Sequence, residues 1–549
     1  MTNTLLALHD PAAARRYYEA DLWRQDTLYM LLQRHAAERP GAFALRDGAR
    51  RFTWAALVDL VDAVAADLAS AGLKRGERVA VWLPNRAETV AVFLACSRNG
   101  YVCNPSLHQN YRVDEIVELV ARTRAAALFA QPGYGADAAS ADIFAAVAGR
   151  PGLRRIYALE GDPAGVVPFP EPSTARPLPP VDGNPDKIVY LAFTSGTTGT
   201  PKGVMHSDNT LLANGRAMVE DWGHDERTVL LSLSPLSHHI ATVAIEQMLA
   251  AGLELVVNSP PPGMAPFDWI VETGATYVMG VPTHAMDILA EMRRRGSDRL
   301  GCVKTFYMAG APIPREVAQA FLDRGVIPQN VYGMSENGSH QYTLPSDPAE
   351  TIVATCGRAC RAYEIALWDQ DNPDIAATPG AVGEIGGRGA CLTLGYFDDQ
   401  QATEESFNRE GWFMSGDLGR LDGNGCLEIV GRKKDLIIRG GRNIHPAKIE
   451  DLAMRHPAVA RCAAFAVADA RLGEKVCLSV IFHDGMRVDP EALLVHLDAA
   501  GLSRYDMPEY FVAVTAYPLT ASGKILKREM VEWVKQGRIA PLPVRWMGR

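Results

Sequence analysis

The stretch Thr194-Ser-Gly-Thr-Thr-Gly-Thr-Pro-Lys-Gly-Val204 follows the apolar run of residues 188–193 and carries the strongest signal in the chain. Its glycines let the backbone approach a ligand closely, its hydroxyls are hydrogen-bond donors, and Lys202 adds a positive charge. A bound polyphosphate needs this combination of many donors around one cation. The candidate phosphate-binding residues are Thr194, Ser195, Gly196, Thr197, Thr198, Gly199 and Lys202.

Two other interpretations of this stretch are weaker. It is not a Walker A loop, because the Gly-x-x-x-x-Gly-Lys-[Ser/Thr] spacing is absent. Its composition would also suit a flexible linker between domains. However, an apolar, strand-like run precedes it and a helical pattern follows at residues 211–220, which favours a ligand loop held between regular elements.

Outward from this loop, short β-rich runs alternate with helical stretches. The predicted strand–helix pairs are residues 51–54 with 55–71, 78–83 with 87–98, 229–233 with 241–251, 254–257 with 266–273, 277–280 with 283–295 and 303–308 with 314–322, and a strand at 125–130 closes the first unit. Such alternation predicts α/β architecture, with parallel sheets covered by helices on both faces. After about residue 388 short turn-rich strands appear, and a compact βα pattern runs from residue 434 onward.

Length and charge limit the possible classes of protein. With 549 residues the chain is too long for one ordinary core, so at least two domains are expected. Hydrophobic residues make up 48% and charged residues 22%, which is typical of a globular protein. The net charge of −9 leaves no basic surplus for binding nucleic acid, so no nucleic-acid partner is expected.

Cysteine usage and the N-terminus bear on the compartment. Nine scattered cysteines indicate a reducing environment, and the isolated pair Cys356 and Cys360 is interpreted as packing rather than as a metal site. The first residues lack the basic start and long apolar stretch of a secretory signal. No apolar run reaches the roughly 18 residues of a membrane span. A cytoplasmic location is therefore expected.

Residues 194–204 resemble the phosphate loop of the adenylate-forming (ANL) superfamily, which contains acyl-CoA synthetases, adenylation domains and luciferases. Further segments resemble motifs of this family in the family's order: Pro235-Leu-Ser-His-His-Ile-Ala241, Gly310-Ala-Pro312, Val331-Tyr-Gly-Met-Ser-Glu-Asn337, Trp412-Phe-Met-Ser-Gly-Asp-Leu418, Gly431-Arg-Lys-Lys-Asp435, Arg439-Gly-Gly-Arg-Asn-Ile-His-Pro446 and Pro518-Leu-Thr-Ala-Ser-Gly-Lys-Ile525. Residues 431–450 look most like the same tract of cyclohexanecarboxylate–CoA ligases. The resemblance implies ATP, Mg²⁺ and coenzyme A as cofactors.

The nucleotide-binding roles follow from this resemblance. Tyr332 is implied to offer a flat face to the purine, and Glu336 to supply a hard oxygen for the metal, Mg²⁺. Asp417 is implied to accept hydrogen bonds from the ribose hydroxyls, and Arg432 to contact the ribose. The remaining ATP- and AMP-binding candidates are Gly310, Ala311, Pro312, Gly333, Met334 and Ser335. Outside this context each motif would be an ordinary turn.

The resemblance also implies the catalytic residues and the domain plan. Lys524 is implied to bridge the attacking carboxylate and the α-phosphate of ATP, where charge builds up in the transition state. Glu336 and Lys202 complete the catalytic set. Lys434 falls on the family's hinge position. The expected domains are an AMP-binding domain over residues 1–433 and a mobile C-terminal lid over residues 434–549, which carries Lys524.

Two further subsites follow from the resemblance. The acyl-pocket candidates are His238, His239, Val281 and Gly333. Ser237 replaces a usual aromatic residue and Ala241 a usual Gly, so the pocket wall is expected to differ in shape. Arg439 is a candidate contact for the phosphates of CoA, while Gly440 and Gly441 would let the pantetheine arm pass against bare backbone.

The expected fold is α/β, with a large N-terminal region of two βαβ subdomains and a distorted small β-barrel, followed by a small, mobile α+β domain. The expected activity is ATP-dependent carboxylate–CoA ligation through an acyl-adenylate. No Arg or acidic residue is obviously aimed at a second polar group, which favours an apolar alicyclic, aromatic or medium-chain monocarboxylic acid.

Other functions must be weighed against this one. An adenylation enzyme loading an acyl carrier protein would share every motif through Lys524, although the Gly440-Gly441 tract and the lack of an attached carrier segment favour CoA. Luciferase-type oxygenation, a P-loop kinase or ATPase, and a non-catalytic nucleotide-binding protein are weaker alternatives. The expected partners are a small carboxylic acid and CoA, and a homodimer is compatible with the sequence.

Overall fold

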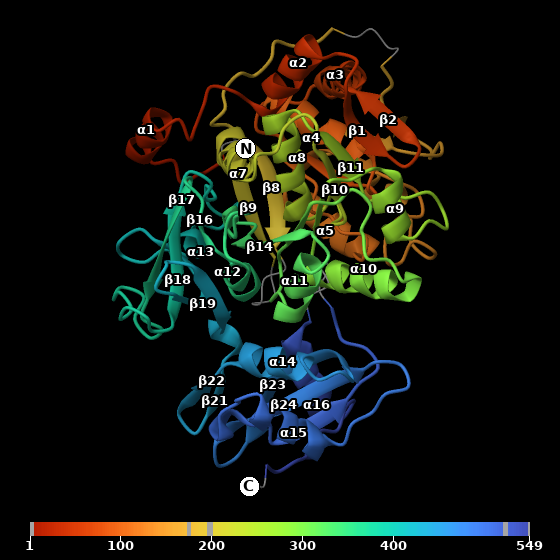
Figure 1. Cartoon of the computed structure of the whole chain (residues 1–549). Coiled ribbons are helices and arrows are strands. Elements are labelled where there is room, and N and C mark those ends of the chain that lie inside the picture. Colours follow the sequence, from red (N-terminus) through yellow and green to blue (C-terminus); the bar gives the residue numbers. More distant parts are fainter. Residues whose placement is uncertain (1–4, 173–176, 195–200, 520–524, 547–549) are drawn as a thin grey trace.

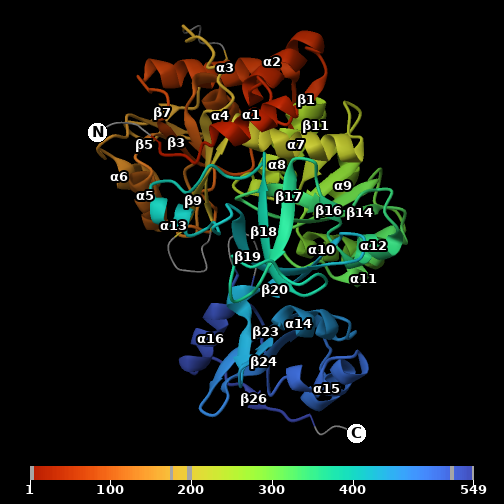
Figure 2. The same ribbon diagram turned by 90° about the vertical axis from the view of Figure 1, so that its left-hand side faces the viewer.

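The computed structural model describes residues 5–172, 177–194, 201–519 and 525–546. Figure 1 shows two large sheets with their helices in the upper part of the molecule, a smaller sheet beside them, and the C-terminal residues below. Figure 2 shows the same arrangement from the side. Among the described residues, no helix combines the length and the apolar character needed to cross a membrane.

The first large sheet has seven strands. They are β3 (Arg78–Trp82), β4 (Val102–Asn104), β5 (Ala125–Ala130), β6 (Arg155–Ala158), β7 (Val167–Pro168), β8 (Ile188–Thr194) and β9 (Lys202–Ser207), in the spatial order β7-β6-β5-β3-β4-β8-β9. All are parallel except β9, which is antiparallel to β8. Every residue of β3 and β5 is buried, as expected for central strands of a parallel sheet.

The second large sheet has nine strands. They are β1 (Phe43–Asp47), β2 (Arg50–Thr53), β10 (Val229–Ser232), β11 (Glu254–Val257), β12 (Tyr277–Gly280), β13 (Thr305–Met308), β14 (Ile327–Met334), β15 (Gly338–Tyr342) and β16 (Arg358–Ala359), in the order β16-β15-β14-β13-β12-β10-β11-β1-β2. The run from β14 to β1 is parallel, and antiparallel strands flank it, with β15 and β16 at one end of the sheet and β2 at the other. The expected pair of βαβ subdomains is confirmed.

The position of β2 corrects one expectation. The predicted strand at residues 51–54 belongs to the nine-stranded sheet and not to the unit that contains β3 and β5. It follows β1 in a hairpin, and β1 pairs in parallel with β11, with Leu45 opposite Leu255. The strand ends at Thr53, whose hydroxyl accepts a hydrogen bond from the N–H of Ala56 and so caps the next helix. Local patterning predicts a strand but not its partner.

Helices cover both large sheets and join them. They are α1 (Pro11–Glu19), α2 (Leu28–Glu38), α3 (Trp54–Ser70), α4 (Ala87–Asn99), α5 (Val113–Arg122), α6 (Ile143–Val147), α7 (Asp208–Trp222), α8 (His239–Ala251), α9 (Pro266–Glu272), α10 (Pro282–Arg295), α11 (Arg315–Leu322), α12 (Ala349–Ala354) and α13 (Gln400–Glu404). One hydrophobic core contains buried residues of both sheets, among them Val79 and Tyr277. Helices α7 and α8 touch at Gly215, where an added Cβ would lie 2.6 Å from the Cβ of Glu246.

A four-stranded antiparallel sheet occupies the region expected as a distorted small barrel. Its strands are β17 (Tyr363–Trp368), β18 (Gly383–Gly389), β19 (Phe413–Leu421) and β20 (Leu427–Arg432), paired in chain order. Tyr332 of β14 packs with Ile385 and Leu427 in one hydrophobic cluster. This contact brings β18 and β20 of the small sheet next to the nine-stranded sheet.

The C-terminal part is a smaller α+β unit. Its strands are β21 (Ile437–Arg439), β22 (Arg442–Ile444), β23 (Val459–Asp469), β24 (Gly473–Phe482), β25 (Tyr510–Ala513) and β26 (Leu542–Pro543), and its helices are α14 (Pro446–Met454), α15 (Pro490–Ala499) and α16 (Lys527–Lys535). A short 3-10 helix, Lys433–Asp435, connects β20 to β21. Arg455 after α14 reaches Glu316 of α11 at 3.4 Å, which links this unit to the nine-stranded sheet.

Candidate active site

Tyr332, Asp417 and Arg432 meet where β14 approaches the four-stranded sheet. The hydroxyl of Tyr332 donates to Oδ2 of Asp417 at 3.0 Å, and Nε of Arg432 lies 2.9 Å from Oδ1 of the same carboxylate. Asp417 is buried, and it stands directly opposite Arg432 in the β19–β20 pairing. Burial and the charge of Asp417 raise the pKa of Tyr332, so its hydroxyl stays a donor. The carboxylate is thereby held in one orientation.

Glu336 and Lys202 meet at the ring of Tyr396. The Tyr396 hydroxyl donates to Oε1 of Glu336 at 3.0 Å, and Nζ of Lys202 lies 4.7 Å from the centre of the Tyr396 ring. Burial raises the pKa of Glu336, while the hydrogen bond from Tyr396 and the charge of Lys202 oppose that rise. A hard carboxylate oxygen and an ammonium group are therefore close together, as a metal-bound polyphosphate requires.

Tyr396 is a site residue that sequence reasoning missed. It lies in the loop between β18 and α13, which runs beside β9 and forms an isolated bridge between Val204 and Tyr396. The N–H of Thr393 donates to the carbonyl of Glu336 at 2.6 Å, and the N–H of Phe397 donates to the carbonyl of Gly203 at 2.7 Å. These contacts join positions far apart in the chain, so no local pattern marks them.

The described residues place both ends of the predicted phosphate loop. Thr194 ends β8 and stands opposite Lys202, which begins β9. The loop therefore joins two antiparallel strands, and α7 begins only after β9, at Asp208. The predicted residues Ser195, Gly196, Thr197, Thr198 and Gly199, together with Lys524, lie outside the described residues.

The ends of β12, β13 and β14 carry the next group of candidates. Gly310 has a φ of +88°, and an added Cβ there would lie 3.6 Å from Val281. Ala311 and Pro312 are exposed beyond it. At Gly333 the backbone passes so near that a Cβ would lie 1.8 Å from the carbonyl oxygen of Gly338. Gly333 is required there because no side chain fits.

Ser335, Glu336 and Asn337 form the turn between β14, which ends at Met334, and β15. The N–H of Met334 donates to Oδ1 of Asn337 at 3.0 Å, and the carbonyl of Ser335 accepts a hydrogen bond from Nε2 of His206 at 2.7 Å. The first bond uses the backbone of the last residue of β14, and the second uses the backbone of the turn. They keep the backbone of this turn in place while leaving the hydroxyl of Ser335 outside these contacts.

The two histidines predicted for the acyl pocket have different surroundings. The ring of His238 lies 4.5 Å from the ring of His108, whose Nδ1 is 2.9 Å from the hydroxyl of Ser237. The ring of His239 stacks on His206 at 5.5 Å, and its Nδ1 lies 3.3 Å from the hydroxyl of Tyr190. The structure therefore does not place His238 and His239 in one environment.

Burial keeps His108 and His239 uncharged. It lowers the pKa of His108 to about 3, with the neighbouring His238 acting in the same direction. Burial likewise lowers the pKa of His239 to about 3. His108 and His239 are therefore neutral near pH 7 and give the adjoining region no positive charge.

The candidate CoA residues lie in the hairpin between β21 and β22. Gly440 and Gly441 have φ values of +57° and +81°, which suit a two-residue turn that other residues rarely adopt. Arg439 forms a bidentate pair with Glu509, with N–O distances of 2.9 and 2.8 Å. The predicted cation is thus engaged within the C-terminal unit. Lys434 lies in the 3-10 helix before β21.

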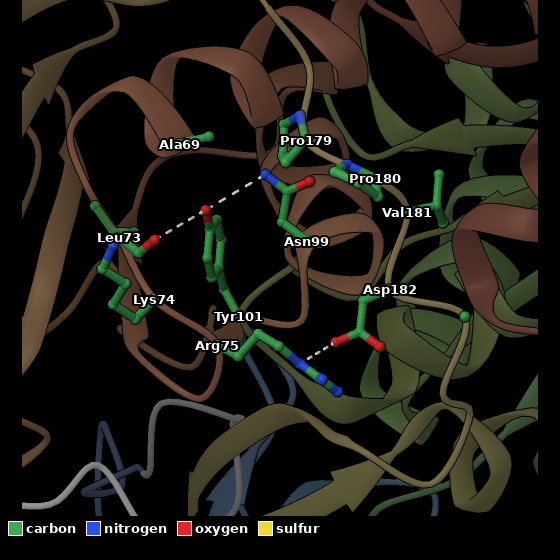
Figure 3. Close-up of a pocket in the computed structure, with 11 residues that line it drawn as sticks. Ala69, Leu73, Lys74, Arg75, Asn99, Tyr101, Pro179, Pro180, Val181 and Asp182 are labelled. Atoms are coloured by element: carbon green, nitrogen blue, oxygen red, sulfur yellow. Dashed lines mark hydrogen bonds and ion pairs between the residues drawn. The ribbon is translucent and has the colours of Figure 1, made fainter.

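A surface hollow of about 530 Å³ lies elsewhere, between α3, α4 and residues 179–183. Figure 3 shows the Arg75 side chain reaching Asp182, at 2.6 Å, and the hydroxyl of Tyr101 between Asn99 and the carbonyl of Leu73. These polar groups therefore bond one another. None of the predicted site residues lines this hollow.

Comparison with known proteins adds to this geometry. The chain matches the family described as AMP-binding enzyme over residues 32–397, and the AMP-binding enzyme C-terminal domain over residues 448–524. Feruloyl-CoA synthase from Amycolatopsis sp is 33% identical, covering 90% of this chain and 97% of its own length. Medium-chain fatty-acid–CoA ligase from Escherichia coli (strain K12) is 28% identical, covering 93% and 91%.

A comparison with solved structures shows that the fold is also similar to that of a known protein. ATP-bound MatB from Rhodopseudomonas palustris has a TM-score of 0.81 to this chain at 26% identity, covering 93% of this chain and 99% of that one. Fold and sequence together define an adenylate-forming enzyme with a large α/β N-terminal part and a smaller C-terminal part. The chain belongs to the AMP-binding enzyme family, and the expected membership of the ANL superfamily is confirmed.

Proposed function

We propose that this protein is an AMP-forming carboxylate–CoA ligase, that is, an acyl-CoA synthetase. The observation that carries the proposal is the meeting of Lys202 and Glu336 at Tyr396, together with the neighbouring Asp417–Arg432 pair. The first group suits the phosphates and their metal. The second offers a fixed, buried carboxylate to two adjacent hydroxyls, as in a ribose.

The reaction has two steps. First, a carboxylate oxygen of the acid attacks the α-phosphorus of ATP, pyrophosphate leaves, and an acyl-adenylate forms. Second, the thiol of CoA attacks the acyl carbon, AMP leaves, and the thiol proton passes to solvent. Activation is needed because a free carboxylate is negatively charged and a poor electrophile. The protein contributes positioning and electrostatic stabilisation, as is usual for ATP chemistry.

Each residue of the site has a proposed task in the first step. The ring of Tyr332 packs against the adenine, and Asp417 with Arg432 holds the ribose. Lys202 and the residues of the 194–200 loop hold the outer phosphates, and Lys524 stabilises the charge at the α-phosphate. Glu336 fits Mg²⁺ because its carboxylate is a hard oxygen donor beside the predicted phosphate site. When bound there, Mg²⁺ supplies neutralising charge for the phosphates.

The second step uses the C-terminal unit. Residues 1–433 and 434–549 form the two proposed domains, and rotation about Lys434 brings the hairpin at Gly440 and Gly441 to the site. This hairpin presents backbone without side chains, which suits close passage of the pantetheine arm. Arg439 contacts a CoA phosphate only if it exchanges its Glu509 partner for that phosphate.

An apolar monocarboxylic acid is the proposed substrate, either aromatic, alicyclic or medium-chain. The neutral state of His108 beside His238 supports an uncharged pocket. The names of the two relatives, a feruloyl-CoA synthase and a medium-chain fatty-acid–CoA ligase, support this choice. The proposed acyl-pocket lining comprises His238, His239, Val281 and Gly333.

The proposed partners are the acid and CoA, in the cytoplasm. The sequence is also compatible with an acyl carrier protein as the acceptor in place of CoA. It is likewise compatible with a homodimer. Purified protein should be assayed with CoA and with a panel of holo-carrier proteins, using equal concentrations of acid and ATP. If a thioester forms only on a carrier protein, the acceptor is that carrier and not CoA. A measurement of the molar mass in solution distinguishes a monomer from a dimer.

The decisive test follows the oxygen atoms of the acid. An acid panel labelled with ¹⁸O in the carboxylate is incubated with ATP, Mg²⁺ and CoA, and the products are analysed by mass spectrometry. We expect AMP that carries one ¹⁸O, together with pyrophosphate and acyl-CoA. Release of ADP, or AMP without the label, would contradict the proposal.

A further inference from the structure

Tyr396 touches both charged groups of the proposed phosphate and metal site. Its hydroxyl lies 3.0 Å from Oε1 of Glu336, and its ring centre lies 4.7 Å from Nζ of Lys202. The described residues include no ion pair between Lys202 and Glu336 themselves, although the charge of Lys202 acts on the carboxyl of Glu336. One aromatic side chain therefore connects an anion and a cation that do not pair directly.

We propose that Tyr396 is a positioning residue, which holds the metal-binding carboxylate and the phosphate-binding ammonium in their working arrangement before substrates arrive. The inference rests on the proposed function of this site. The hydroxyl engages Oε1, and this orients the carboxylate with Oε2 as the oxygen for the metal. The ring attracts the ammonium through its π-face and so keeps Lys202 from closing onto Glu336.

Backbone hydrogen bonds hold the loop that carries Tyr396 in a fixed position, as a positioning role requires. The N–H of Thr393 donates to the carbonyl of Glu336, and the N–H of Phe397 donates to the carbonyl of Gly203, next to Lys202. The N–H of Tyr396 itself donates to the hydroxyl of Thr403 at 3.0 Å. The loop is thus tied to Glu336 and to the neighbour of Lys202, and Tyr396 is only 7% exposed.

Hydrogen-bonded partners of metal ligands have a measurable effect. Removing such a partner typically weakens metal affinity by about 10- to 100-fold, because the ligand loses its orientation. The hydroxyl and the ring of Tyr396 act on different groups, so two substitutions separate them. Tyr396→Phe removes the hydroxyl and keeps the ring, and Tyr396→Leu removes both.

The experiment measures binding and not turnover. Mn²⁺ replaces Mg²⁺, and its binding to the full-length protein in the presence of ATP is followed by electron paramagnetic resonance. For Tyr396→Phe we expect a Kd for Mn²⁺ raised by about 10- to 100-fold, with unchanged affinity for ATP measured calorimetrically in EDTA. For Tyr396→Leu, the affinity for ATP in EDTA should fall as well, because Lys202 loses its aromatic contact.

The matched control is Tyr157→Phe. Tyr157 is also a buried tyrosine, and its hydroxyl donates to the carboxylate of Asp67 at 2.7 Å, but it lies on β6 of the seven-stranded sheet. Its Mn²⁺ affinity should equal that of the unmodified protein. A double variant with Glu336→Gln separates a direct effect from general damage: in that background, Tyr396→Phe should cost little further metal affinity.

Different results overturn different statements. If Tyr396→Phe binds Mn²⁺ as tightly as the unmodified protein, or if its loss is equally large in the Glu336→Gln background, the positioning role is wrong. If the unmodified protein binds no metal–ATP complex, or if it releases ADP, the proposed function itself fails. The positioning role of Tyr396 rests on that function, so these results overturn it as well.

Discussion

Nε of Arg432 lies 2.9 Å from Oδ1 of Asp417, and the two residues face each other across neighbouring antiparallel strands. The other carboxylate oxygen accepts the hydroxyl of Tyr332 at 3.0 Å. A hairpin of the small sheet thus presents an oriented anion to the end of the nine-stranded sheet. The proposed ribose site therefore depends on contact between two sheets that are distant in the chain.

Asp417→Asn should weaken ATP binding. The amide keeps the shape but loses the charge that orients Arg432 and accepts two hydroxyl hydrogen bonds, each worth about 1.5–3 kcal/mol when the acceptor is charged. We expect the KM for ATP to rise by about 10-fold or more, with a smaller change in the KM for the acid. Steady-state kinetics of pyrophosphate release provides the measurement.

The same hairpin supplies the control for this variant. Arg420 and Glu428 also face each other across β19 and β20, but their side chains are about half exposed. Glu428→Gln should leave the KM for ATP unchanged, because an exposed pair contributes little. Equal effects of the two substitutions would remove the assigned role of Asp417.

Lys524→Ala should slow the first half-reaction by at least about 10²-fold, the scale of losing one transition-state donor. This lysine lies outside the described residues, so the prediction rests on the sequence. Thioester formation from a supplied acyl-adenylate should be largely spared. Rapid-quench measurement of both half-reactions tests this, and an equal loss in both would contradict the role.

Lys434→Pro should have the opposite effect. Proline restricts rotation about the backbone, and Lys434 lies in the short 3-10 helix between β20 and β21. We expect adenylation close to that of the unmodified protein and a clear loss of thioester formation. If adenylation alone falls, the hinge is not at this residue.

Gly333→Ala should destabilise the protein. The new Cβ would lie 1.8 Å from the carbonyl oxygen of Gly338, so the backbone must shift. Overpacking of this kind costs about 1–3 kcal/mol of the free energy of unfolding. Gly423→Ala is the control, since no atom lies within 4 Å of its added Cβ. Urea unfolding of both variants gives the comparison, and indistinguishable midpoints would refute the steric argument.

Acid should destabilise the fold through His340. Its buried ring lies 5.5 Å from the ring of Tyr332 and 4.1 Å from that of Tyr363, and burial lowers its pKa to about 3. In the unfolded chain a histidine has a pKa of about 6.5. Below that pH, His340 is therefore protonated in the unfolded chain but stays neutral in the folded protein. The contribution of His340 to stability is therefore complete above about pH 6.5, and it falls by about 1.4 kcal/mol per pH unit as the pH drops from about 6.5 towards about 3.

His340→Phe removes this contribution. The urea midpoint of the variant should depend less on pH between about pH 6 and pH 4 than that of the unmodified protein. A large part of the dependence should persist, because burial also lowers the pKa of His108 and His239 to about 3 and the pKa of His206 and His224 to about 4. Parallel pH profiles of the two proteins would show that His340 does not carry the expected effect.

Much of the architecture was predictable because strands and helices have local patterns. The strands Glu254–Val257 and Tyr277–Gly280 occur at the predicted bounds, since each is a short apolar run followed by a helical stretch. Pairing is a different matter. The strand at residues 50–53 pairs with β1, and β1 pairs with β11. This pairing depends on which strands are buried together in the folded core.

For the candidate site too, some features were predictable from local motifs and others were not. Motifs predicted Tyr332, Asp417 and Arg432 as neighbours of one nucleotide, and the structure brings these three side chains together. It also engages Arg439 with Glu509, a residue 70 positions further on. The sequence provides no local signal for that ion pair, because it depends on β21 and β25 lying in one sheet on either side of β24.

By itself, the sequence determined the alternation of strands and helices, the glycine-rich loop after β8 and the family to which the chain belongs. These features depend on short-range backbone preferences and on spacing within single segments. Only the tertiary structure decided that Tyr396 lies between Lys202 and Glu336. Such contacts join segments that are 60 residues or more apart in the chain, and their geometry exists only when the sheets and loops have packed.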